Sequence, residues 1–291
     1  MNKNYTKCFE QQRPALVAIA YQMLGERSGA QDLVQDTWEI WNKADKSCID
    51  TPPAWLRTVI NRLAIDALKS AKKKREVYVG PWLPEPLIED PKIGPYDEFN
   101  LAREYELALM WAMQRLTAEE RSAFILRKVF DSDYSELSTV LDKSEANCRK
   151  IVSRASKKVA DTKLKFSVTP EETGLMLQSF AQACSAMNHD EVLSLLAPDV
   201  ISISDGGGRV RAALRPLIGA HEVANVLLSI LRKSPSNSAA EVKRVNGQPA
   251  IVVTGSHNEG LIFTIGMNSA NRIVWIYIMR NPDKLSGSTN S

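Results

Sequence analysis

The chain is poor in the residues that build disulfide frameworks and metal sites. It has four cysteines and three histidines in 291 residues, no CxxC pair, and no histidine spaced to share a ligand set with a cysteine. This excludes a disulfide-stabilised scaffold and a zinc finger, and predicts a protein with reduced thiols, no metal and no cofactor. The cysteines are Cys8, Cys48, Cys148 and Cys184.

The sequence also lacks a long apolar run and an apolar N-terminal segment, so it predicts a cytoplasmic protein that does not enter a membrane. The net charge is only +3, but the charge is unevenly distributed. Residues 69–75 and 149–165 are basic, and the mostly acidic stretch 85–98 lies between them. Two basic stretches suggest two contacts with one polyanion, although two solvated helix ends would have the same composition.

Residues 132–159 have the pattern of a helix-turn-helix. Leu137, Val140 and Leu141 predict one buried face over 134–141, and Ser144 is a suitable N-cap for a second helix. That second helix has an apolar face, and its other face is basic and amide-bearing. A solvated amphipathic hairpin is the alternative explanation.

Residues 1–78 predict three helices. The first covers 9–24 and ends at Gly25, the second begins with Ser28 as its cap, and the third opens at Pro52–Pro53. The third helix places basic and amide side chains opposite a long apolar stripe and ends in a basic cluster, which suits phosphates and a few bases.

Two of these segments together resemble the extracytoplasmic-function (ECF) sigma factors of the sigma-70 family. The stretch AQDLVQDTWEIW, followed by PPAWLRTVINRLAIDALKSAKKKRE, resembles region 2, and LTAEERSAFILRKVF with the helix-turn-helix resembles region 4. The resemblance implies an RNA polymerase sigma factor that binds core polymerase through its clamp helices and flap and recognises the −10 and −35 promoter elements. It favours a monomer.

The resemblance also implies roles for individual residues. The positions that match the polymerase-binding stretch are Asp32, Leu33, Gln35, Asp36 and Trp38. For Trp41 we expect core packing instead. The positions that match the −10 surface are Lys46, Asp50, Asn61, Arg62, Asp66, Lys69, Lys73 and Arg75, with Lys46–Asp50 as the loop for a flipped base. The −35 candidates are Ser144, Asn147, Arg149, Lys150 and Arg154.

Residues 167–285 predict an α+β domain, with helices first and a curved antiparallel sheet after them. Strands are expected at 200–204, 211–218 and in the runs after 240, with a hairpin at Asn246–Gly247. This order is similar to the SnoaL-like (nuclear transport factor 2-like) cone. The acid–base candidates Asp199, Asp205, His189 and His257 form no recognisable catalytic pair, so we expect no enzyme.

Three short segments resemble signatures of the sigma-factor subgroup that carries such a domain. They are WLPEPL at 82–87, DGGGRVRA at 205–212 and NPDKL at 281–285. We hypothesise that the first two meet, with Arg209 or Arg211 paired to Glu85 or Glu89, and that the domain regulates the sigma portion. The residues of this regulatory interface are Trp82, Leu83, Pro84, Glu85, Asp205, Gly206, Gly207, Gly208, Arg209, Arg211, Asn281, Pro282, Asp283, Lys284 and Leu285.

The expected architecture is therefore multidomain. Two all-α sigma domains are joined by an extended, proline-rich linker and followed by the α+β cone. The expected bounds are 1–78, 79–100, 101–166 and 167–285, with a disordered tail at 286–291. Two other functions stay open: a helix-turn-helix repressor with a ligand-sensing domain, and a SnoaL-like enzyme with a DNA-binding N-terminus. The sequence does not decide whether the last domain activates, inhibits or does both.

Overall fold

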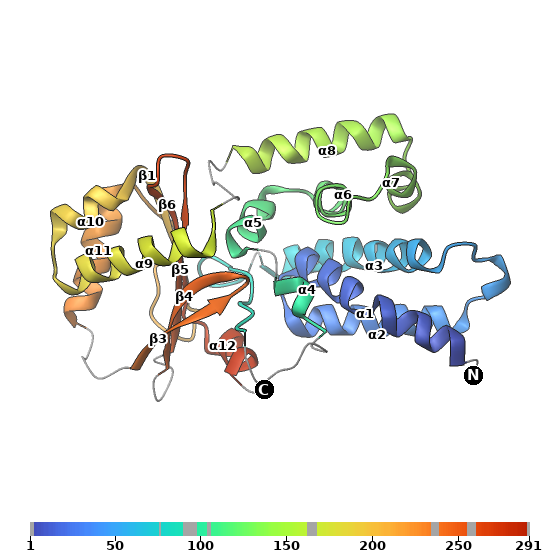
Figure 1. Ribbon diagram of the computed structural model, residues 1–291, viewed down its shortest axis with the longest axis horizontal. Coiled ribbons are helices and arrows are strands. Elements are labelled where there is room, and N and C mark those ends of the chain that lie inside the picture. The colour runs from blue at the N-terminus through green and yellow to red at the C-terminus, as the bar shows by residue number, and fades with distance from the viewer. Residues whose placement is uncertain are drawn as a thin grey trace. The chain divides into compact units, whose positions relative to one another are not determined.

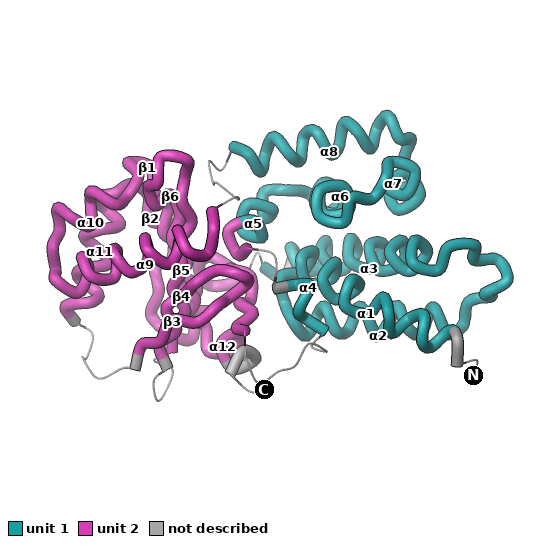
Figure 2. The backbone as a smooth tube through the Cα atoms, in the orientation of Figure 1, with its two compact units in different colours: residues 1–76, 91–105, 109–162 teal, residues 77–90, 106–108, 163–291 magenta. Residues whose placement is uncertain are grey.

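The structure is a computed structural model, and it describes residues 3–75, 77–89, 98–103, 106–161, 168–233, 239–254 and 260–289. The chain forms two compact units (Figure 2). Unit 1 comprises residues 1–76, 91–105 and 109–162, and unit 2 comprises residues 77–90, 106–108 and 163–291. The first part of the predicted linker, up to residue 90, therefore belongs to the unit that contains the C-terminal sheet, and the rest of it belongs to unit 1.

The first half of unit 1 is a helical bundle made of α1 (Lys3–Leu24), α2 (Arg27–Lys43) and α3 (Pro52–Arg75), with the 3-10 turn η1 (Lys46–Cys48) before α3 (Figure 1). Gly25 has a φ of 75° and ends α1, as expected. Ser28 is not the cap of α2, because the helix already starts at Arg27 and its N-cap is Glu26.

The second half of unit 1 contains the short helices α4 (Asn100–Arg103) and α5 (Leu107–Ala112), the turn η2 (Met113–Arg115), and α6 (Ala118–Lys128), α7 (Tyr134–Leu141) and α8 (Glu145–Ala160); α5 starts in unit 2. A capping box of Thr117 and Glu120 starts α6. Ser144 caps α8, and Asp142 between α7 and α8 adopts a left-handed conformation that turns the chain sharply. The predicted helix-turn-helix is confirmed to within a residue.

Unit 2 is built on a six-stranded sheet in the order β2-β1-β6-β5-β4-β3. The strands are β1 (Leu196–Asp205), β2 (Leu217–Ile218), β3 (Ala239–Val245), β4 (Gln248–Thr254), β5 (Leu261–Met267) and β6 (Ile273–Met279). Helices α9 (Pro170–Ser185), α10 (His189–Leu195) and α11 (Ala220–Lys233) contribute to an apolar core with the sheet, and α12 (Pro282–Thr289) follows β6.

Unit 2 differs from the prediction in three places: twice in the sheet and once in the tail. The sheet is mixed and not purely antiparallel, because β1 and β6, the second and third strands in the order, pair in parallel. The strand expected at 211–218 is limited to its last two residues. The tail expected to be disordered continues as α12 to Thr289, since Pro282 and Asp283 suit the first turn of a helix. The hairpin at Asn246–Gly247 is confirmed, and both residues have positive φ.

Candidate nucleic-acid surfaces and linker-binding site

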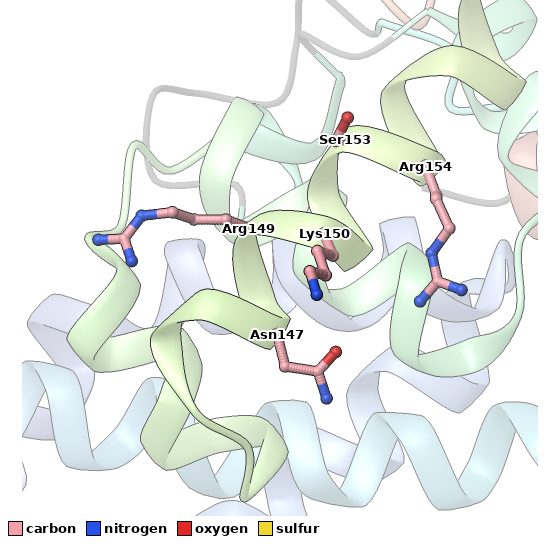
Figure 3. Close-up of a pocket in the computed structure, with 5 residues that line it drawn as sticks. All are labelled: Asn147, Arg149, Lys150, Ser153 and Arg154. Atoms are coloured by element: carbon pink, nitrogen blue, oxygen red, sulfur yellow. The ribbon is translucent and has the colours of Figure 1, made fainter.

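The exposed face of α8 carries most of the predicted −35 residues. Buried side chains from Cys148 to Val159 anchor the other face of the helix. A shallow concavity in this exposed face is lined by Asn147, Arg149, Lys150, Ser153 and Arg154 (Figure 3). Ser153 was missed at the sequence level because a serine on a helix carries no charge signal. Ser144, the remaining candidate, accepts a hydrogen bond from the Asn147 backbone N–H as the N-cap.

Arg149 points away from the other side chains of this face (Figure 3). One of its guanidinium nitrogens donates to Glu145 at 2.8 Å, and the guanidinium lies 4.7 Å from the centre of the Tyr134 ring. Stacking on an aromatic ring and pairing with a carboxylate both restrict an arginine. Arg149 is thus held in place, whereas Lys150 and Arg154 extend toward the same side as Asn147.

Two residues of the predicted −10 surface on α3, Asn61 and Arg62, bond to helices of the second half of unit 1. Asn61 is fully buried, and its Oδ1 accepts from the Ser122 hydroxyl at 3.0 Å. Arg62 donates to the backbone oxygens of Thr139 at 2.6 Å and Val140 at 3.3 Å. The prediction that Asn61 faces outward is wrong, because this part of α3 packs against α6.

The end of α3 is similarly occupied. Arg75 donates to the Leu24 backbone oxygen at 2.7 Å and to Glu26 at 3.2 Å. Lys69 and Asp66 remain exposed and lie 3.4 Å apart. The side chain of Lys73 lies outside the described residues.

The loop predicted to accept a flipped base holds its lysine against the protein. Lys46 donates to the Ala44 backbone oxygen at 2.7 Å and to that of Trp41, and its ammonium lies 4.7 Å from the Trp41 ring centre. Asp45 caps η1 by accepting from the Ser47 N–H at 2.9 Å. Hydrogen bonds from the Ser47 hydroxyl and from this N–H lower the pKa of the Asp45 carboxyl. Asp50 is exposed.

The predicted polymerase-binding face of α2 is partly exposed. Asp32, Gln35 and Asp36 point outward, while Leu33 is only 7% exposed and packs in the bundle core. Leu33 is therefore a core residue here and not a surface contact. Trp38 is half-buried and makes an edge contact with the ring of Phe9. Trp41 is buried, as expected.

The three short signatures meet inside unit 2, around the carboxylate of Asp205. Asp205 is fully buried, and its carboxylate accepts hydrogen bonds from four donors among the described residues. Its donors are the Tyr78 hydroxyl at 2.6 Å, the Leu83 N–H at 2.9 Å, the Gly207 N–H at 3.0 Å and the Lys284 ammonium at 2.7 Å. Burial and the bond to Asp205 raise the pKa of the Tyr78 phenol. A buried carboxylate with this many donors is a strong tie between linker and domain.

Lys284 and Asn281 complete this tie from the NPDKL segment. Lys284 also donates to the Leu83 backbone oxygen at 2.6 Å, and its ammonium lies 4.2 Å from the Trp82 ring centre. Asn281 donates to the Tyr78 hydroxyl at 2.9 Å. A β-carbon on Gly207, which has a φ of 61°, would lie 2.4 Å from the Asn281 amide nitrogen, so the sequence needs glycine there.

The rest of the linker runs along the edge of the sheet next to β3. The Leu87 N–H donates to the Asn246 Oδ1 at 2.9 Å, and the Leu87 backbone oxygen accepts from the Asn246 N–H at 3.0 Å. Ile88 forms an antiparallel bridge with Val245, and the Glu89 N–H donates to the Arg244 oxygen at 2.9 Å. At this end the extended linker also pairs with the sheet, because an open sheet edge offers unpaired backbone groups.

The predicted charge pairs at this interface are wrong. Arg209 pairs with Asp283 at 3.3 Å and Glu89 with Arg244 at 3.5 Å. The backbone oxygen of Arg211 accepts from Arg280, and Glu85 is buried. The DGGGRVRA and WLPEPL segments are instead tied by the Asp205 carboxylate, which accepts from the Leu83 N–H.

The catalytic candidates do not form a constellation. Asp205 is used in the linker tie, and His189 is half-buried and bonds to Asn225 at 3.0 Å. Asp199 is exposed, and His257 lies outside the described residues. In the described part of the chain, no three His, Cys, Asp or Glu side chains gather as a metal site. None of the helices described combines the length and apolarity that crossing a bilayer requires.

One buried carboxyl was missed at the sequence level. Glu106 accepts a hydrogen bond from the Gln248 amide at 2.9 Å, and burial raises the pKa of Glu106 to about 7. The contact ties the residue before α5 to β4, within unit 2. Nothing local in the sequence signals it, because Glu106 and Gln248 are far apart along the chain.

Known proteins share the two helical regions described above. Residues 8–74 match the family model for sigma-70 region 2, and residues 106–159 match the model for sigma-70 region 4. The chain belongs to the ECF RNA polymerase sigma factors.

It is 32% identical to the ECF RNA polymerase sigma factor SigJ of Mycobacterium tuberculosis, across 96% of this chain and 93% of that protein. It is 27% identical to the probable ECF sigma factor SigI of the same species, across 94% of this chain and 92% of that protein. The crystal structure of Mycobacterium tuberculosis SigJ superimposes with a TM-score of 0.78 at 29% identity, and the match covers 97% of this chain and 99% of that one. The similarity therefore includes the C-terminal unit as well as the two helical regions.

Proposed function

We propose that this sigma factor initiates transcription at promoters recognised by α8 at the −35 element and by α3 with the 46–50 loop at the −10 element. The single observation that best supports the −35 role is the exposed face of α8. It groups Asn147, Lys150 and Arg154 around one concavity (Figure 3). Amide and guanidinium groups can bond bidentately to adenine and guanine edges, and lysine can reach phosphates.

On core polymerase, the outward side chains of α2 contact the clamp helices, and the second half of unit 1 contacts the flap. The exposed acids Asp32 and Asp36, with Gln35 between them and half-buried Trp38 beside them, support the first assignment. An acidic face with an aromatic anchor suits a basic helical partner. The chain acts as a monomer in this complex and needs no cofactor.

The SnoaL-like unit regulates the sigma portion in cis by holding the linker. The Asp205 contacts and the pairing of Ile88 with Val245 support this role, since they fix 78–89 on the unit. A linker of fixed path has a shorter reach than a free one of the same length. By fixing the linker, the unit sets which spacing between the −10 and −35 elements the chain prefers.

Run-off transcription with purified core polymerase tests the proposal. The full-length chain is compared with a chain that ends after Lys165, on a library of promoter fragments with varied spacing between the two elements. We expect initiation by the full-length chain and a changed spacing preference after truncation. Absence of initiation by either chain contradicts the sigma function, and an unchanged preference contradicts the regulatory role.

A further inference from the structure

The ring of Tyr134, the first residue of α7, is contacted by two arginines from neighbouring helices. The Arg149 guanidinium of α8 lies 4.7 Å from the ring centre, and that of Arg127, near the end of α6, lies 5.4 Å from it. We propose that Tyr134 is a positioning residue for −35 recognition, whose ring holds Arg149 in the orientation that reads one guanine. This inference rests on the proposed −35 role of α8 and adds a specificity-determining residue that lies outside that helix.

Tyr134 is itself fixed in place from the side of α6. The Arg127 Nη1 donates to the Asp131 carboxylate at 2.6 Å and to the Ser132 backbone oxygen at 3.2 Å. These bonds tie the guanidinium to the loop between α6 and α7, while its carbon lies over the half-buried tyrosine ring. The ring is therefore held by contacts that do not involve α8, and it offers Arg149 a fixed surface for stacking.

Arg149 is also restrained by its own helix. Its Nη2 donates to the Glu145 carboxylate, one turn earlier on α8, at 2.8 Å. A guanidinium has five N–H donors, and Glu145 takes one of them. The side chain of Arg149 is 54% exposed. The arginine is thus oriented by two partners and still presents donors to a ligand.

Position and chemistry assign this arginine to a base edge. Recognition helices contact bases with their N-terminal residues, and Arg149 is the fifth residue of α8. A guanidinium fork bonds bidentately to O6 and N7 of guanine, and this match depends on the orientation of the fork. Lys150 and Arg154 extend to a different side of α8 (Figure 3). We therefore expect the guanine read by Arg149 to be a separate position from those that Lys150 and Arg154 contact.

The ring acts by preorganisation. Without it, the Arg149 side chain samples more orientations before binding and loses more conformational entropy when it meets the base. A cation–π contact at an exposed site accounts for about two- to fivefold in an equilibrium constant. That loss falls on the one position that Arg149 reads. A tyrosine that only filled space in the helix-turn-helix would instead affect binding to every sequence equally.

The test measures base preference with the holoenzyme. Core polymerase and the full-length chain are incubated with a pool of random-sequence duplexes, and the bound and unbound DNA are sequenced. We expect Arg149→Ala to abolish a guanine preference at one position and Tyr134→Leu to weaken the same preference about two- to fivefold. Tyr134→Phe is the matched control, because it keeps the ring and should keep this preference. Preferences at the other positions should not change in any of these variants.

Glu145→Gln tests the same restraint from the other side. It removes the charge that holds Nη2, so it should weaken the same guanine preference, although losing a negative charge near DNA raises affinity for all sequences. Base preference is compared within each variant, so that general gain cancels. If Tyr134→Leu does not fold, Glu145→Gln decides.

Three results would overturn the positioning role. The first is an Arg149→Ala chain that loses no guanine preference, and the second is an unchanged preference in Glu145→Gln and in any folded Tyr134→Leu chain. The third is a loss in Tyr134→Leu that is equal at all positions and also present in Tyr134→Phe. A pool from which the wild-type holoenzyme enriches no sequence contradicts the sigma function itself, and this result is distinct from the other three.

Discussion

Replacing Asp205 with Asn tests how the linker is held. The substitution keeps the shape of the side chain but removes its charge, so the Lys284 ammonium, 11% exposed and 2.7 Å away, loses its counterion. The new amide also places N–H groups against a site where the Tyr78 hydroxyl and the Leu83 N–H both donate. Breaking a buried ion pair from one side costs about 3–5 kcal/mol. At about 3 °C per kcal/mol for a unit of this size, the melting temperature of unit 2 should fall by ~10 °C or more.

Hydrogen exchange makes the prediction specific to the linker. In the wild-type chain the Leu83 N–H is buried and bonded, so it should exchange slowly. In Asp205→Asn it should exchange at least about tenfold faster, as a local loss of ~1.4 kcal/mol implies. Asp283→Asn is the control, because its pair with Arg209 is about two-thirds exposed on both sides and is worth under about 1 kcal/mol. Equal melting temperatures and unchanged Leu83 exchange in the two variants would refute the reasoning.

The remaining predictions concern other contacts. Glu106→Gln should stabilise the protein by up to about 3 kcal/mol at pH 8 and by little at pH 4. The pKa of Glu106 in the folded protein is raised to about 7, so the wild type loses stability as the pH rises from ~4.5 to 7. Melting curves at several pH values measure this difference, and parallel curves for both chains would contradict it. Gly207→Ala should lower the free energy of unfolding by about 2–4 kcal/mol, because of the positive φ and the clash with Asn281. Gly174→Ala, inside α9 with room for a β-carbon, should raise it by about 0.5–1 kcal/mol. Urea unfolding measures both, and similar effects of the two substitutions would be inconsistent with the structure. Lys150→Ala should weaken duplex binding and reduce the slope of log affinity against log salt concentration by about one, as expected for the loss of a phosphate contact. Filter binding over a series of salt concentrations measures the slope, and an unchanged slope would show that Lys150 does not contact DNA.

Local patterns in the sequence predicted the elements that depend on neighbouring residues. The helix-turn-helix follows from the spacing of Leu137, Val140 and Leu141 and from the cap at Ser144, and α7 and α8 formed within a residue of the prediction. The hairpin at Asn246–Gly247 follows from the positive φ that these two residues tolerate. The family membership also follows from local motifs, because each lies within one contiguous stretch.

Only the tertiary structure decided which of these polar side chains are available. Asn61 and Arg62 have the same spacing on α3 whether they face solvent or α6 and α7, and nothing in the local sequence distinguishes the two cases. The pairs expected for Arg209 and Arg211 were wrong for the same reason. The segments are tied through Asp205 instead, which Tyr78, Leu83 and Lys284 reach from distant parts of the chain. Periodicity and capping are properties of adjacent residues, whereas burial and pairing depend on which distant segments pack together.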